Sequence, residues 1–124
     1  MPRQITSRRI EPRVELSSDL GAWIEFRDAD DRRHHLPLTE LSVGGCAFHM
    51  PGSIVGIRLG AMLADVRLSA AEMEIRGNVE VCHLTRGFGS DYSCGVRFFP
   101  SSDDDRNRLI GLVSRLEALD RIRS

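Results

Sequence analysis

Short apolar runs separated by turn residues follow one another along the chain from Val14 onward. Runs of this length and spacing are typical of the strands of a β-sandwich or β-barrel. They predict six or seven strands, at Val14–Leu16, Ala22–Phe26, His34–Leu38, Cys46–His49, Met62–Leu68, Met73–Leu84 and Tyr92–Phe99. The segments between the runs, such as DADD at 28–31 and PGS at 51–53, are rich in residues that turn the backbone at low cost. We therefore predict an all-β fold, a small antiparallel barrel of about six strands.

The clearest strand signal is the segment MEIRGNVEVCHL at 73–84. Its apolar or small positions are Met73, Ile75, Gly77, Val79 and Val81, and its polar positions are Glu74, Arg76, Asn78 and Glu80. Successive side chains of a strand point to opposite faces, so an alternation of period two predicts one face in the core and one face outward.

After Pro100 the apolar period changes to that of a helix. The apolar positions in this last segment are Leu109, Leu112, Val113, Leu116, Leu119 and Ile122. Ser102 or Asp103 can cap the N-terminus, and acidic residues in the first turn and arginines in the last turn suit the helix dipole. We predict one amphipathic helix over 103–123, which covers an open end of the barrel.

Length and composition indicate one soluble domain. The chain has 124 residues, of which 41% are hydrophobic and 28% charged, so it is long enough for one core and too short for a multidomain enzyme. Seventeen basic residues, all arginine, stand against 18 acidic ones, and the net charge of −1 provides no global attraction to nucleic acid or anionic membranes. We therefore expect no nucleic-acid polymer among the partners.

We expect the compartment to be the cytoplasm. No window approaches the 18 apolar residues of a spanning helix, and the N-terminus has no apolar segment of a signal peptide, so we expect no membrane insertion. The three cysteines, Cys46, Cys82 and Cys94, include no CxxC spacing and favour a reducing environment. We expect them in the core, together with Trp23 and most of the phenylalanines.

The first thirteen residues differ from the rest of the chain. They have no apolar periodicity and carry Arg3, Arg8, Arg9 and Arg13 against Glu11. We predict a flexible basic arm over 1–13, followed by a single domain over 14–124. Arg9 and Arg13 lie four residues apart and can converge on one anion. A guanidinium binds a phosphate, or the O6/N7 edge of guanine, through two parallel hydrogen bonds.

A second segment, ELSVGG at 40–45, complements the arm. Glu40 and Ser42 point to the same side if the segment is extended, and Gly44 and Gly45 let the backbone approach a ligand or adopt a positive φ. A carboxylate is the natural acceptor for the N1 and N2 donors of guanine, so the two segments together suit a guanine nucleotide. The same segment also suits a plain turn in which Ser42 bonds a backbone group, and the two interpretations are compatible.

In this order the two segments resemble the signature of the PilZ family, bacterial receptors for cyclic di-GMP. Arg9 and Arg13 match the family's RxxxR, and Ser42 and Gly45 match its [D/N]xSxxG. Arg8 is similar to the additional arginine common in that arm. The segments IRGNVEVCHL and CGVRFF resemble the family's late strands, so the resemblance covers roughly residues 8–119.

The resemblance implies a PilZ-type barrel with a C-terminal helix and a non-catalytic receptor for cyclic di-GMP, without a cofactor. The ligand-binding residues it implies are Arg8, Arg9, Arg13, Glu40, Ser42, Gly44, Gly45 and Arg97. Arg97 is included because it alternates with the apolar Val96 and Phe98 and therefore faces solvent or the ligand. The expected partners are cyclic di-GMP and a protein target that reads the ordering of the arm, and the oligomeric state is left open between monomer and homodimer.

One position departs from the family pattern. Glu40 stands where the family has Asp or Asn, and the additional methylene displaces the carboxylate by about 1.5 Å or requires another rotamer. We expect binding to survive this change, and the alternative is a degenerate member of the family that acts as a protein-interaction adaptor without nucleotide. A weaker third hypothesis is an RNA-binding barrel with an arginine arm.

The histidines and cysteines invite two further interpretations, a metal site and a thiol nucleophile. Their spacing supports neither, because His34 and His35 are neighbours that project from opposite faces of a strand, and Cys46 and His49 fit no usual ligand pattern. No nucleophile is paired with a base, so we predict neither a metal site nor an enzyme.

Overall fold

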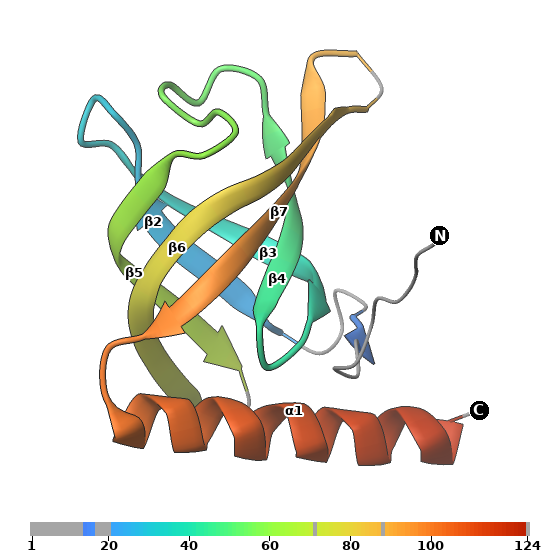
Figure 1. Ribbon diagram of the computed structural model, residues 1–124. Coiled ribbons are helices and arrows are strands. Elements are labelled where there is room, and N and C mark those ends of the chain that lie inside the picture. Colours follow the sequence, from blue (N-terminus) through green and yellow to red (C-terminus); the bar gives the residue numbers. More distant parts are fainter. Residues whose placement is uncertain (1–13, 17–20, 71, 88, 124) are drawn as a thin grey trace, which may run out of the picture.

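The computed structural model describes residues 14–16, 21–70, 72–87 and 89–123. Within these residues the chain forms seven strands and one helix (Figure 1). They are β1 (Val14–Glu15), β2 (Trp23–Arg27), β3 (Arg33–Leu41), β4 (Gly45–Pro51), β5 (Met62–Ala70), β6 (Met73–Arg86), β7 (Asp91–Pro100) and α1 (Asp103–Arg123). The predicted strands and the helix are all present. The predicted arm over 1–13 lies outside the described residues.

The sheet closes on itself. Its strand order is β1-β3-β2-β5-β6-β7-β4, all pairings are antiparallel, and β3 also pairs with β4. Six strands therefore form a closed barrel, and β1 is an additional strand on β3. The predicted fold class is confirmed. Closure removes the exposed sheet edges that an open sheet of this size presents to other chains.

The alternation predicted for β6 is present in its burial pattern. Ile75, Gly77, Val79 and Val81 are buried, while the polar residues between them face outward. The same rule separates two neighbouring phenylalanines on β7, because Phe98 points into the core and Phe99 is 40% exposed. Phe99 is therefore an exception to the prediction of a phenylalanine core, since a strand can direct only one of two adjacent side chains inward.

The helix α1 lies across one end of the barrel (Figure 1). It packs against β6, β1 and β7 and buries Leu109, Leu112, Val113 and Leu116. Ser102 is its N-cap, since the Ser102 hydroxyl oxygen accepts the backbone N–H of Asp105 at 3.1 Å. The Asp105 carboxylate in turn accepts the backbone N–H of Arg76 on β6 at 3.0 Å, so the start of the helix is tied to the barrel.

The predicted turn at 28–31 joins β2 to β3 and is organised by Asp28. One carboxylate oxygen of Asp28 accepts the backbone N–H groups of Asp30 and Arg32 at 2.9 and 3.0 Å, and the other lies 2.8 Å from Nε2 of His34. The contact with His34, followed by the two backbone donors, holds the pKa of Asp28 below its ordinary value of 3.8.

Replacing Asp28 by asparagine should therefore destabilise the barrel in a pH-dependent manner. A carboxyl group with a lowered pKa in the folded state stabilises the fold above its unfolded pKa, and this contribution disappears as the pH falls through the folded pKa. We expect the difference in unfolding free energy between wild type and Asp28→Asn to be constant near neutrality and to shrink below about pH 4. Urea unfolding between pH 7 and pH 3 measures it, and a difference independent of pH would contradict the role of the charge.

Candidate functional site

The segment ELSVGG forms the connection from β3 to β4. The backbone N–H of Ser42 donates to the carbonyl of Gly45 at 2.8 Å, and the carbonyl of Ser42 accepts the N–H of Gly45 at 3.4 Å. The Ser42 hydroxyl lies 3.2 Å from that same N–H and 3.3 Å from that same carbonyl oxygen. The prediction that Ser42 bonds a backbone group in a tight turn is confirmed, and this turn fixes where Glu40 at the end of β3 lies.

Glycine is required at position 45 for close approach rather than for a positive φ. A Cβ built on Gly45 collides with the carbonyl oxygen of Val96 on β7, and the φ of Gly45 is not in the left-handed region. The neighbouring Gly44 carbonyl accepts the backbone N–H of Phe98 at 2.9 Å. The turn is therefore held tightly against β7, next to Arg97.

A depression of about 220 Å³ opens beside this turn. Its lining comes from β3, the turn, β4, β6 and β7, and comprises Glu40, Leu41, Ser42, Gly44, Gly45, Cys46, Ala47, Cys82, His83, Gly95, Val96 and Arg97. Five of the eight predicted ligand-binding residues meet here, namely Glu40, Ser42, Gly44, Gly45 and Arg97. The other three, Arg8, Arg9 and Arg13, lie outside the described residues.

Arg97 supplies the positive charge of the depression. It lies opposite Gly45 on β4 and opposite Glu80 on β6, and its guanidinium is 3.8 Å from the Glu80 carboxylate. The Arg97 side chain is 62% exposed and Glu80 is 36% exposed, so this ion pair is loose and leaves the guanidinium free to turn toward an anion. Glu40 on β3 supplies a carboxylate to the same depression and is itself half-buried.

Cys82 and His83 are among the seven lining residues that were not predicted to bind ligand. A β-bulge between Val81 and His83 makes Cys82 the additional residue of β6. It places His83 opposite Gly95. A Cβ added to Gly95 would lie 3.3 to 3.6 Å from atoms of the His83 side chain. The break of the two-residue period after Val81, together with the glycine in CGVRFF, is the sequence signal that could have indicated them.

Cys46 and Cys94 are packing residues of the core, and Cys46 also borders the depression. Cys46 and Cys94 are buried, and burial raises the pKa of both thiols, that of Cys94 to about 11. They therefore stay protonated near neutral pH and are poor nucleophiles.

In the part of the chain that the structure describes, no group of three or more His, Cys, Asp or Glu side chains is arranged to hold a metal ion. Among the same residues, no helix is long and apolar enough to cross a membrane.

The fold is that of solved PilZ proteins. The structure of the K. pneumonia MrkH–c-di-GMP complex matches 97% of this chain and 57% of that chain, with a TM-score of 0.81 and 21% identity. The PilZ domain of YcgR from Escherichia coli with c-di-GMP matches 94% of this chain and 97% of that one, with a TM-score of 0.76 and 16% identity. The Bacillus subtilis inhibitor of motility, MotI/DgrA, has a TM-score of 0.74 at 13% identity over 94% of this chain and 54% of that one.

A curated relative shares a shorter stretch. The protein-glutamate methylesterase/protein-glutamine glutaminase 4 of Hahella chejuensis (strain KCTC 2396) is 33% identical over 58 residues, which are 47% of this chain. The match spans only 15% of that relative, and the chain covers little more than half of MrkH. The model of the PilZ domain family matches residues 7–115. Because this match covers most of the chain and the barrel has the same fold as solved PilZ proteins, the chain belongs to the PilZ domain family.

Proposed function

We propose that this PilZ domain is a receptor for cyclic di-GMP, which it binds between its N-terminal arm and the depression beside the β3–β4 turn. The observation that carries the proposal is the convergence of separate segments on one place. Glu40, Ser42 and Arg97 line the same depression, although Arg97 is more than fifty residues away in sequence. MrkH and the YcgR domain, which share the fold, were solved with c-di-GMP.

The position of β1 supports a contribution of the arm. Val14, which directly follows Arg13 in sequence, pairs with Leu41, and Glu15 pairs with Glu40. Val14 therefore lies at the end of β3, where the depression begins, and Arg13 precedes it in the sequence. Arg8, Arg9 and Arg13 then need only a short path to a ligand in that depression.

The chemistry of the site suits a guanine dinucleotide. The Glu40 carboxylate can accept from guanine N1 and N2, and the guanidinium groups of Arg97 and of the arm can bind the phosphates or the O6/N7 edge. In the proposed mechanism the dianionic ligand draws the arm onto the barrel. The exposed surface and its charge change together, and a protein partner reads that change.

Calorimetric titration of the purified chain with cyclic di-GMP tests this function. We expect micromolar or tighter binding, a preference over cyclic di-AMP and GTP, and equal or tighter binding by Glu40→Asp, which restores the shorter side chain.

We expect Arg97→Ala to weaken binding about tenfold, because one bidentate contact contributes roughly 1 to 3 kcal/mol. Arg86→Ala, an exposed arginine of the same sheet outside the depression, is the matched control.

Two results would count against the proposal. If neither heat nor a change in melting temperature accompanies addition of cyclic di-GMP, the domain is an adaptor without nucleotide. Equal weakening by Arg97→Ala and Arg86→Ala would remove the depression from the site.

A further inference from the structure

A second depression lies on the outer surface of the barrel, over β2, β3, β5 and β6. Its volume is about 450 Å³, within the range of small-molecule sites. The buried Phe26 and Val66 contribute to its lining, and its charged residues are Glu25, Arg27, Arg33, Asp65, Arg67 and Arg76. It shares no residue with the depression beside the β3–β4 turn. We refer to Arg27, Arg33, Arg67 and Arg76 as the arginine quartet.

The quartet consists of two pairs of like charges that face each other across neighbouring strands. Arg27 on β2 lies directly opposite Arg33 on β3, and Arg67 on β5 lies directly opposite Arg76 on β6. Like charges directly opposite in an antiparallel sheet are destabilising, so each pair raises the free energy of the fold unless an anion lies between or beside the two guanidinium groups.

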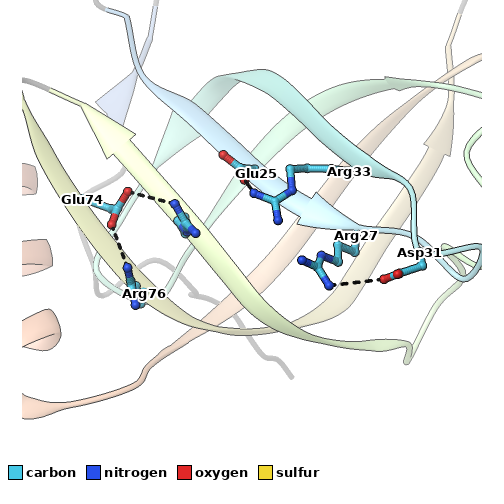
Figure 2. Close-up of polar contacts among 7 residues, drawn as sticks. Glu25, Arg27, Asp31, Arg33, Glu74 and Arg76 are labelled. Carbon is cyan, nitrogen blue, oxygen red and sulfur yellow. Dashed lines mark hydrogen bonds and ion pairs between the residues drawn. The ribbon is translucent and has the colours of Figure 1, made fainter.

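The carboxylates around the quartet neutralise it unevenly (Figure 2). Arg33 is held by Glu25 at 2.6 Å, whereas Arg67 and Arg76 share the single carboxylate of Glu74, each at 3.4 Å. Arg27 contacts only the exposed turn residue Asp31 in this network, also at 3.4 Å.

Among the lining residues themselves positive groups outnumber negative ones, while Asp31 and Glu74 beside the depression bring the local total to four of each. The residues that line it carry four guanidinium groups against the two carboxylates of Glu25 and Asp65, because Glu74 and Asp31 lie outside the lining. The quartet side chains are between 39% and 63% exposed, and three of their four ion pairs have the long distance of 3.4 Å. Exposed ion pairs at this distance contribute little to the stability of the fold. The guanidinium groups can therefore turn toward another anion at a low cost in free energy.

We propose that this depression binds a small phosphorylated molecule with at least two negative charges. Each arginine pair would take one anionic group, since the guanidinium fork matches phosphate oxygens with two parallel hydrogen bonds. Glu25 on β2 lies directly opposite Arg67 on β5, so Arg27 and Arg67 are diagonal neighbours across these two strands, and the long guanidinium side chains of both pairs can reach a ligand between them.

The charge pattern favours a small molecule over a nucleic-acid strand. Four carboxylates, from Glu25, Asp31, Asp65 and Glu74, border the quartet, so the basic surface is confined to the depression. A polyanion that runs along the sheet would meet Asp31 and Glu74 beside the depression as well as Glu25 and Asp65 within it, whereas a compact dianion would meet only the latter two.

Calorimetry with inorganic pyrophosphate at about 150 mM salt tests the proposal, because this ionic strength screens non-specific surface attraction. We expect the wild type to bind pyrophosphate, and Arg27→Gln and Arg76→Gln, one variant from each pair, each to bind at least tenfold more weakly. Arg115→Gln, an exposed arginine on α1, should bind like the wild type. Thermal unfolding of each variant shows whether it is folded. If Arg76→Gln does not fold, the affinity of Arg27→Gln alone decides the test.

The same titration in saturating cyclic di-GMP separates this site from the first. We expect pyrophosphate affinity to be unchanged by cyclic di-GMP and by Arg97→Ala. Loss of pyrophosphate binding in either condition would place the anion in the first depression and overturn the proposal. Absence of binding to the wild type, or wild-type affinity in both quartet variants, would overturn it as well.

Discussion

The double substitution Arg9→Ala/Arg13→Ala is expected to weaken the binding of cyclic di-GMP at least about 100-fold. Under the proposed function each arginine makes a charge-assisted contact with a phosphate or with guanine, and two contacts of about 1.4 kcal/mol each correspond to this factor. The loss should be large because the ligand carries two negative charges, whereas the whole chain has a net charge of −1 and offers no compensating global field.

A matched control removes the same amount of charge elsewhere. Arg106→Ala/Arg115→Ala deletes two exposed arginines of α1, so it changes the net charge equally without touching the arm. Calorimetry or fluorescence competition with cyclic di-GMP measures both variants. If the two double variants lose affinity equally, the effect is one of overall charge and the arm is not a ligand-binding segment.

The second large effect concerns the helix. Leu112→Ala is expected to lower the free energy of unfolding by about 2 to 5 kcal/mol, because it leaves a cavity where α1 packs on the barrel. The Leu112 side chain is only 1% exposed. Since α1 also contacts β1, which pairs with Leu41 and Glu40, loosening of the helix should reduce the affinity for cyclic di-GMP as well.

Ile110→Ala is the control within the same helix. Ile110 is 42% exposed, so its truncation should lower the unfolding free energy by about 1 kcal/mol or less. Urea unfolding followed by circular dichroism gives both values. A Leu112→Ala loss no larger than that of Ile110→Ala would mean that the helix does not cover the core.

Local periodicity predicted the elements well where one face of an element is apolar. The prediction of a strand over 73–84 corresponds to β6, and the helix was predicted with the bounds that α1 has. The prediction for β3 ended at Leu38, three residues too early. Thr39 and Glu40 interrupt the apolar alternation of the sequence, and the strand continues past them through a β-bulge between Leu38 and Glu40.

The candidate site was predictable only in part. The segment ELSVGG indicated Glu40, Ser42, Gly44 and Gly45, which all line the first depression. His83 was missed as a lining residue because a second bulge reverses the side to which it points. A bulge is a feature of strand pairing, and the break of the two-residue period after Val81 does not by itself tell which residue is the additional one.

The sequence by itself determined the strands, the helix and the order of the two motifs, since these depend on side-chain alternation, turn residues and capping within short segments. Only the tertiary structure decided which distant residues meet. Pairing of β4 with both β3 and β7 brings Glu40 and Arg97 to one depression, and the β2–β3 and β5–β6 registers build the two arginine pairs. Barrel closure and strand register arise from long-range pairing. They depend on how the whole core is buried and not on the preference of any one segment.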